Sequence, residues 1–158
     1  ETRATMGFTV SLSEACQNIV EHAGRGGWVG VQVYNWAKRR VGRQVVVIAV
    51  SDAGQGFRQS LGTTRVRAIA GDRWSDGEAL EAAVTNGYSR HTEPGRGQGI
   101  RGIKGYVHRH DGRLSIRSGT ARVTIVPPWD DSPAREDGLP AFAGAQVQII
   151  IPERAEGS

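Results

Sequence analysis

Apolar residues concentrate in five segments that have the composition of strands. Each segment is rich in β-branched or aromatic residues, as strands are: 28–34, 43–50, 113–118, 120–126 and 146–151. The basic, glycine-containing stretch between the first two segments predicts a hairpin, and Gly119 predicts a turn between the third and the fourth. The second segment is apolar at successive positions, which is typical of a central strand that is buried on both faces.

Three other segments repeat their apolar residues with the period of a helix: 9–23, 76–88 and 100–110. Asp76 can cap the start of the second segment. The third segment carries Ile103 and Val107 on one face, as a helix that lies on a sheet does. The pattern therefore predicts helices interleaved with strands in one α+β domain.

Two further segments show little periodicity. Residues 58–94 have a weak apolar pattern outside their one helix, and a glycine-rich run follows them. Long segments of this kind inside a compact domain are often functional lids, so we expect a lid over about residues 57–99. Residues 127–140 are polar and rich in proline, which predicts a loop, and we expect the tail 153–158 to be frayed.

The first helix carries a polar stripe opposite its apolar face. Glu14, Asn18 and His22 recur at every fourth residue and therefore fall along one side of the helix. A carboxylate one turn away from an amide oxygen suits a hard cation such as Mg²⁺. The stripe is a candidate metal site.

The second candidate site follows the strand 43–50 directly. Asp52 stands at the end of this strand in the pattern Asp52-x-Gly54-x-Gly56. A carboxylate in this place can accept a hydrogen bond from an exocyclic amine such as that of adenine, and the glycines allow a flat ring to approach the backbone. An ordinary strand-to-loop turn has the same composition and is an equally good reading of this motif alone.

The third candidate is the glycine run that leads into the helix 100–110. In Gly95-x-Gly97-x-Gly99, backbone amides and a helix N-terminus are positioned to hold phosphate oxygens. No Gly-Lys-Ser or Gly-Lys-Thr follows, which excludes a Walker A loop. No buried strand leads into the run, which argues against a dinucleotide fingerprint.

Composition narrows the class of protein. A chain of 158 residues with 38% hydrophobic content fits one domain. The single cysteine, Cys16, excludes an internal disulfide framework and a cysteine-rich zinc site. The net charge of +4 raises phosphate ligands, acidic partners and nucleic acid as candidates, but the basic residues are scattered, which makes nucleic acid an unlikely partner.

The sequence also predicts where the protein works. It contains no apolar run of about 18 residues and no pattern of a secretory signal, so we expect a cytoplasmic protein without a membrane contact. The chain begins at Glu1 without a methionine, and we expect it to be a domain of a longer protein.

Together, the three motifs resemble the ATP-binding domain shared by gyrase B, HSP90, histidine kinases and the DNA-repair protein MutL, known as the GHKL family. The resemblance rests on Glu14-x3-Asn18, Asp52-x-Gly54-x-Gly56 and Gly95-x-Gly97-x-Gly99 in this order, and it spans about residues 11–152. It implies the Bergerat fold: a two-layer α/β sandwich with a mixed, mostly antiparallel sheet, helices on one face, and ATP between the helices and a lid.

The resemblance also implies a role for each motif. Asn18 would be the ligand of Mg²⁺, and Glu14 would be the catalytic residue that polarises the attacking water or hydroxyl near the γ-phosphate. Asp52 would bind the adenine amine, with Gly54 and Gly56 admitting the ring. The residues that would close over the phosphates are Gly95, Gly97 and Gly99.

Three charged residues near these motifs have less certain roles. Arg96 and Arg101 would reach the phosphates as charge clamps, although both suit an exposed surface equally well. His22 lies one turn beyond the implied metal ligand, and a solvent-facing or capping role is favoured over a contact with phosphate.

Two features depart from the pattern of the family. The last strand begins Gly144-Ala145 where many members have Gly-Thr, so a hydroxyl on the adenine side is missing and nucleotide affinity is expected to be lower. The first strand and helix that precede the asparagine-bearing helix in the family are short or absent, which leaves the sheet edge and any homodimer contact open.

Within the family, the small size, the Glu-x3-Asn motif and the phrase Glu21-His22-Ala23 look most like the bacterial serine kinases that act as anti-sigma factors. This likeness implies a protein kinase with Mg-ATP as cofactor and a protein substrate or antagonist as partner. The alternatives are the catalytic domain of a sensor histidine kinase, and a conformational ATPase or non-catalytic nucleotide-binding module.

Overall fold

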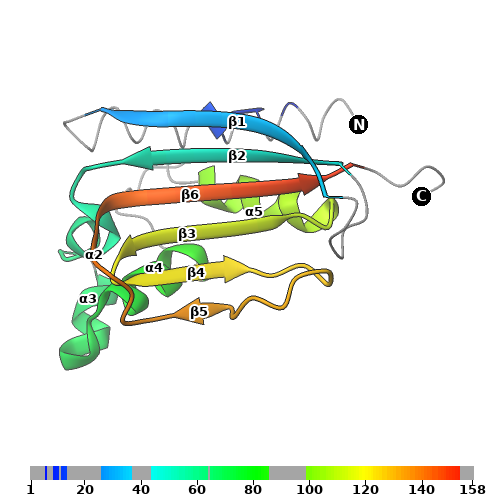
Figure 1. The fold of residues 1–158 in the computed structure, drawn as a ribbon. Helices are drawn as coiled ribbons and strands as arrows, with labels where there is room; N and C mark the ends of the chain where they lie inside the picture. The colour runs from blue at the N-terminus through cyan, green and yellow to red at the C-terminus, as the bar shows by residue number, and fades with distance from the viewer. Residues whose placement is uncertain are drawn as a thin grey trace.

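The fold is built on one six-stranded sheet. The computed structural model describes residues 26–36, 44–63, 65–85 and 99–153, together with residues 6, 9, 10, 12 and 13. The strand order is β1-β2-β6-β3-β4-β5 (Figure 1), and all five pairings are antiparallel. The strands are β1 (Gly27–Asn35), β2 (Gln44–Asp52), β3 (Arg113–Gly119), β4 (Ala121–Ile125), β5 (Arg135–Glu136) and β6 (Phe142–Pro152).

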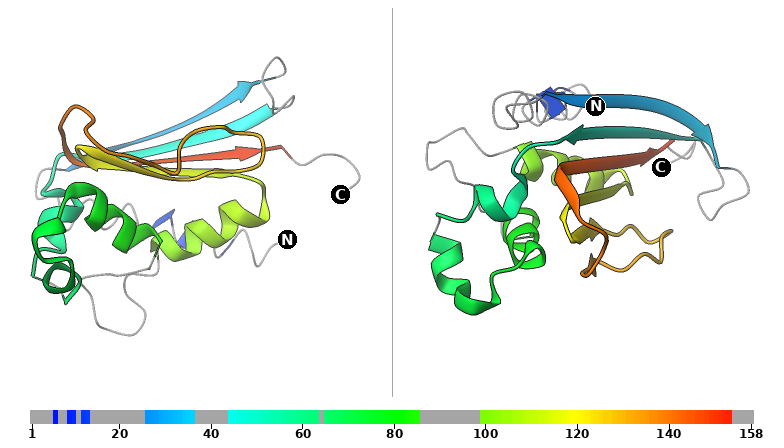
Figure 2. Two further views of the ribbon diagram at one scale, coloured as in Figure 1. Left: turned by 90° about the horizontal axis from the view of Figure 1, so that it is seen from below. Right: turned by 60° about the vertical axis from the view of Figure 1, so that its left-hand side comes forward.

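Helices cover one face of this sheet, and the views from two further directions show the second layer (Figure 2). The described helices are α2 (Gly56–Ser60), α3 (Arg65–Ala70), the 3₁₀-helix η1 (Gly71–Arg73), α4 (Asp76–Val84) and α5 (Gly99–Arg109). The two-layer α+β sandwich expected from the sequence is confirmed.

Alternation along the strands explains where the core lies. Leu114 and Ile116 on β3 point toward the helices and are buried, and Ile149 on β6 joins them. On the other side of the interface, Ile103 and Val107 lie on one face of α5, as predicted. Burying such a side chain contributes about 1.5–3 kcal/mol, so this cluster fixes α5 against the middle of the sheet.

The central strand β6 is longer than its sequence pattern predicts. It begins at Phe142 rather than at Gln146, because its first residues continue the ladder along the end of β3. The register shifts between Ser118 and Gly119, which accommodates the irregular start of β6. The extension brings Gly144 close to the end of β2.

The segment before the glycine run contains more helix than the sequence predicts. Besides α4, the short helices α2 and α3 form around a second core cluster in which Leu61 and Trp74 pack against Ala79 and Ala83. The helix α4 is capped by Ser75, whose hydroxyl accepts the backbone N–H of Glu78 at 3.2 Å. The prediction that Asp76 caps this helix is wrong, because Asp76 is its first residue and reaches the sheet instead.

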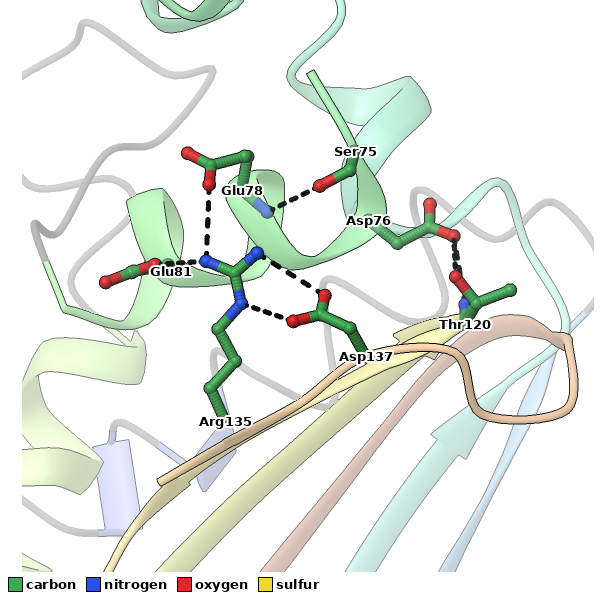
Figure 3. Close-up of polar contacts among 7 residues, drawn as sticks. All are labelled: Ser75, Asp76, Glu78, Glu81, Thr120, Arg135 and Asp137. Atoms are coloured by element: carbon green, nitrogen blue, oxygen red, sulfur yellow. Dashed lines mark hydrogen bonds and ion pairs between the residues drawn. The ribbon is translucent and has the colours of Figure 1, made fainter. Parts of the chain in front are cut away.

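Polar contacts attach α4 to the far edge of the sheet (Figure 3). Asp76 Oδ2 accepts hydrogen bonds from the backbone N–H and the hydroxyl of Thr120, at 2.9 and 3.0 Å. Arg135 in β5 donates to Asp137 at 2.8 Å, to Glu81 at 2.5 Å and to Glu78 at 3.3 Å. The residues 127–140, expected to be a loop, therefore contain a short strand that holds a helix.

The geometry of α4 depends on this arginine. The hydrogen bond to Asp137, with those to Glu81 and Glu78, outweighs burial and raises the pKa of Arg135 above its usual value. A Cβ at Gly77 would collide with the side chains of Asp137 and Arg135, so a residue with no side chain lets the arginine reach the helix. We call Arg135, Glu78, Glu81 and Asp137 the α4 clamp.

Candidate functional site

The end of β2 presents a carboxylate on the helix-covered side of the sheet. Asp52 follows Ile48 and Val50 in alternation, so its side chain lies on the same face as these buried residues. One of its oxygens, Oδ1, accepts the backbone N–H of Gly54 at 2.8 Å, which fixes the carboxylate over the turn. Among the described residues, no donor contacts the second oxygen, Oδ2.

Two glycines with positive φ bring the backbone close around Asp52. Gly144 has φ of +77°, and a Cβ there would collide with the carbonyl oxygen and Oδ1 of Asp52. Gly56 has φ of +70°, and its Cβ would lie 2.5 Å from the hydroxyl of Ser118 and 3.0 Å from the carbonyl oxygen of Gly144. No side-chained residue fits either position, so the two glycines let the turn after β2, Ser118 and the start of β6 pack closely around Asp52.

A buried hydroxyl that sequence reasoning missed joins these segments. The hydroxyl of Ser118 donates to the carbonyl of Gly144 at 2.6 Å and accepts the N–H of Phe57 at 3.2 Å. Ser118 is only 3% exposed and links β3, β6 and the first turn of α2. The sequence does hold a clue to this residue. Ser118 is a polar residue that alternates with Leu114 and Ile116 and so falls on the face of β3 that should be apolar.

The motif Asp52-x-Gly54-x-Gly56 therefore forms a site with residues distant in sequence. The structure brings together Asp52, Gly54, Gly56, Ser118 and Gly144, which we call the carboxylate cradle. Its two glycines have different tasks. Gly56 takes the positive φ that the turn needs, whereas Gly54 contributes its N–H to the carboxylate.

The helices that flank the glycine run in sequence, α4 and α5, are in contact. The helix α4 ends at Val84 and α5 begins at Gly99. The ammonium group of Lys104 in α5 donates to the carbonyl of Val84 at 3.4 Å, where a cation also complements the C-terminal end of the helix dipole. The last glycine of the run, Gly99, thus stands at the start of a helix, as the sequence predicts.

Several predicted site residues lie outside the described part of the chain: Glu14, Asn18, His22, Gly95, Arg96 and Gly97. Arg101 is described and is exposed on α5. Thr9, Val10, Leu12 and Ser13 are helical, which agrees with the helix expected there, and Leu12 packs against the main core. Ser13, the residue immediately before the polar stripe, is therefore helical. Leu12 packs against the same core cluster as Ile103 and Val107 of α5.

Comparison with known proteins gives one match. The family model described as histidine kinase-, DNA gyrase B-, and HSP90-like ATPase matches residues 6–131, which is most of the chain. No curated protein and no solved structure matches it significantly. None of the described helices has the length and apolarity needed to cross a membrane.

Proposed function

The chain belongs to the histidine kinase-, DNA gyrase B- and HSP90-like ATPase family, and from this membership we propose that it is the Mg-ATP-binding domain of a bacterial regulatory protein kinase. Its substrate is a serine on a protein partner, in a switch of the anti-sigma-factor type. The family supplies ATP binding. The kinase reaction and its acceptor are the proposal.

The observation that carries the proposal is the carboxylate cradle. Oδ1 of Asp52 is held by the N–H of Gly54, and among the described residues no donor contacts Oδ2. This suits a flat heterocycle with an exocyclic amine, whereas a carbonyl in the same place would face the carboxylate. In this proposal Asp52 accepts from the adenine amine and disfavours guanine.

The adenine assignment is tested by Asp52→Asn. In this variant an amide nitrogen replaces Oδ2, so a hydrogen-bond donor would face the adenine amine, which is also a donor. We therefore expect ATP to bind about 100-fold more weakly. Calorimetry with Mg-ATP measures the change, and Asp111→Asn serves as the control because Asp111 is exposed at the other end of β3. Equal affinities in the Asp52 variant and the native chain would remove Asp52 from the adenine site.

The remaining roles follow from the motifs outside the described residues. Asn18 ligates the Mg²⁺ that accompanies the triphosphate, and Glu14 polarises the attacking hydroxyl. Gly95, Gly97 and Gly99 close over the phosphates, and Arg96 is their charge clamp. The attachment of Gly99 to the start of α5, with Lys104 bridging to α4, supports a phosphate-facing position for this run.

The reaction is tested by Glu14→Gln with ATP labelled on the γ-phosphate. Loss of a general base costs about 100-fold or more in turnover, so we expect ATP binding to persist and label transfer to fall by that factor. Unchanged turnover in the variant would exclude Glu14 as the base.

The stability of the label identifies the acceptor. Phosphoserine survives acid and is lost in alkali, whereas phosphohistidine is lost in acid. Acid-labile label on the partner would favour the sensor histidine kinase reading. Hydrolysis without transfer to any protein would favour a conformational ATPase.

A second copy of the chain is also a partner in this proposal. The edge strand β1 carries no charged residue and no proline, and its apolar side chains are exposed on both faces of the strand: Trp28, Val29, Val31, Val33 and Tyr34. Among the described residues, no strand pairs with the outer edge of β1, and an edge of this kind is a template for another strand. Antiparallel pairing of two β1 strands across the edge continues the sheet through a homodimer.

A further inference from the structure

The face of the sheet opposite the helices contains a polar hollow. The alternation that sends Leu114 and Ile116 toward the core sends their neighbours the other way. These neighbours line a cavity of about 140 Å³: Arg113, Ser115 and Arg117 from β3, Arg122 from β4, and Gln146 and Gln148 from β6. The hollow lies on the other side of the sheet from the carboxylate cradle.

Two of the three arginines in the hollow have carboxylate partners. The Nε atom of Arg113 lies 2.6 Å from Asp130 Oδ2, and its Nη1 donates to Gln148 at 3.0 Å. Burial acts to raise the pKa of Asp130, but hydrogen bonds from Ser132 and the charge of Arg113 keep it below its usual value. Arg122 pairs with Glu136 at 3.1 Å. The charges of these two arginines are therefore compensated.

Arg117 differs from its neighbours. Its Nη2 donates to the carbonyl of Pro140 at 2.7 Å, and its guanidinium lies 5.6 Å from the centre of the Phe142 ring. Its Nε is buried and, like the Nε of Arg113, has no hydrogen-bond partner among the described residues. Unlike Arg113 and Arg122, Arg117 has no carboxylate of the described residues within ion-pair distance. A buried donor without an acceptor is destabilising, so this guanidinium gains from an added acceptor.

The strand register places further donors beside Arg117. Arg117 on β3 is directly opposite Arg122 on β4, whose charge Glu136 compensates but whose guanidinium adds N–H groups to the hollow. On its other side, Arg117 is opposite Gln146 of β6, whose amide is a further donor. The hollow has room for a few water-sized groups. Its uncompensated charge, its donors and its size all suit a small oxyanion.

We propose that this hollow binds an oxyanion, a carboxylate or phosphate group, with Arg117 as the main ligand and Gln146 and Arg122 beside it. A guanidinium binds both groups through two parallel hydrogen bonds, which an amide or ammonium cannot reproduce. Because the site is on the open face, it is independent of the nucleotide site, and it stands whether or not the kinase proposal does.

The test uses the side-chain Nε–Hε signal of Arg117 in NMR spectra of the whole chain. Potassium phosphate and potassium acetate are titrated separately at constant ionic strength, with potassium chloride as the reference. We expect a saturable shift of this signal with at least one oxyanion and none with chloride. A shift with phosphate alone identifies a phosphate site, and a shift with acetate identifies a site for carboxylates as well.

Variants connect this shift to the proposed ligand. Binding is followed through the amide signals of Ser115 and Gln146, and Arg117→Gln should weaken it at least about 10-fold. Arg117→Lys keeps the charge without the planar fork and should also weaken it, which covers the case in which the glutamine variant fails to fold. Arg109→Gln, on the exposed side of α5, should change nothing. No saturable shift with either oxyanion, or equal affinity in both Arg117 variants, would overturn the proposal.

Discussion

At the scale of single residues, Gly144 determines how close the last strand comes to Asp52. Its positive φ disfavours any side chain, and a Cβ there would also collide with the carbonyl oxygen and Oδ1 of Asp52. Gly138 has nearly the same φ, +73°, but nothing lies within 4 Å of its Cβ position. A side chain at Gly138 would therefore cause backbone strain alone, whereas a side chain at Gly144 would cause the same strain and a collision with Asp52.

The comparison of Gly144→Ala with Gly138→Ala follows directly. Each variant should lose about 1 kcal/mol or more of unfolding free energy through backbone strain. Only Gly144→Ala should also displace Asp52, so we expect a further loss of stability and an ATP affinity at least about 10-fold lower. Urea unfolding and calorimetry measure both quantities. Equal losses of stability and affinity in the two variants would show that the approach of Gly144 to Asp52 has no role.

Local sequence predicts only part of the cradle. Asp52, Gly54 and Gly56 are recognisable because they follow an apolar strand within five residues of one another, although their role in adenine binding stays a prediction. Ser118 is not recognisable in this way, because its partners Phe57 and Gly144 are 61 and 26 residues away in the chain. A contact of this kind depends on strand order, which the hydrophobic pattern does not specify.

At the scale of elements, the α4 clamp attaches α4 to the edge of the sheet. Arg135 in β5 binds Glu78 and Glu81 of α4, and Asp137, which follows β5, binds the same guanidinium (Figure 3). These groups are partly exposed, so each pair alone contributes little, but a single guanidinium that serves three carboxylates makes a network. Its loss leaves three negative charges close together.

We therefore expect Arg135→Gln to lower the unfolding free energy by about 1–2 kcal/mol at low salt. The loss should shrink as salt screens the remaining carboxylates. Urea unfolding at low and high ionic strength measures this, with Arg73→Gln in η1 as the control because Arg73 is exposed. If the loss is the same at both salt concentrations, packing of the arginine stem rather than charge holds α4.

The elements differ in how well the sequence predicts them. The hairpin of β1 and β2 and the helix α5 follow from strong apolar patterns. The strand β5 contains only Arg135 and Glu136, which is too short for an alternating pattern to be seen in the sequence. It forms through antiparallel pairing with Arg122 and Val123 of β4. The helices α2 and α3 likewise depend on a cluster around Trp74 whose other side is formed by Ala79 and Ala83 of α4.

At the scale of the whole molecule, the sheet separates the two proposed sites. The helix-covered face holds the carboxylate cradle, and the open face holds the arginine-lined hollow. The strand β5 at one edge is two residues long, whereas β1 at the other edge is nine residues long and has only exposed residues (Figure 1). Assembly through a continuous sheet therefore favours β1.

The sequence of β1 is well suited to pairing with itself. In an antiparallel dimer centred on Val31, the two copies of Val31 are opposite each other, Val29 is opposite Val33, and Trp28 is opposite Tyr34. These cross-strand pairs are apolar or aromatic, the classes that stabilise sheets most. A two-fold axis at Val31 gives the closed, isologous contact that is commonest among homodimers.

This arrangement predicts a single position at which one charge breaks the dimer. Val31→Lys places two ammonium groups opposite each other at the axis, so the dimer should dissociate at least about 10-fold more readily while the monomer keeps its fold, because Val31 is 62% exposed. Sedimentation equilibrium measures the dissociation constant. Ala134→Lys adds the same charge beside β5, and it should leave the dimer intact. A native chain that is monomeric at high concentration would exclude the β1 dimer, and a dimer broken only by Ala134→Lys would place the contact at β5 instead.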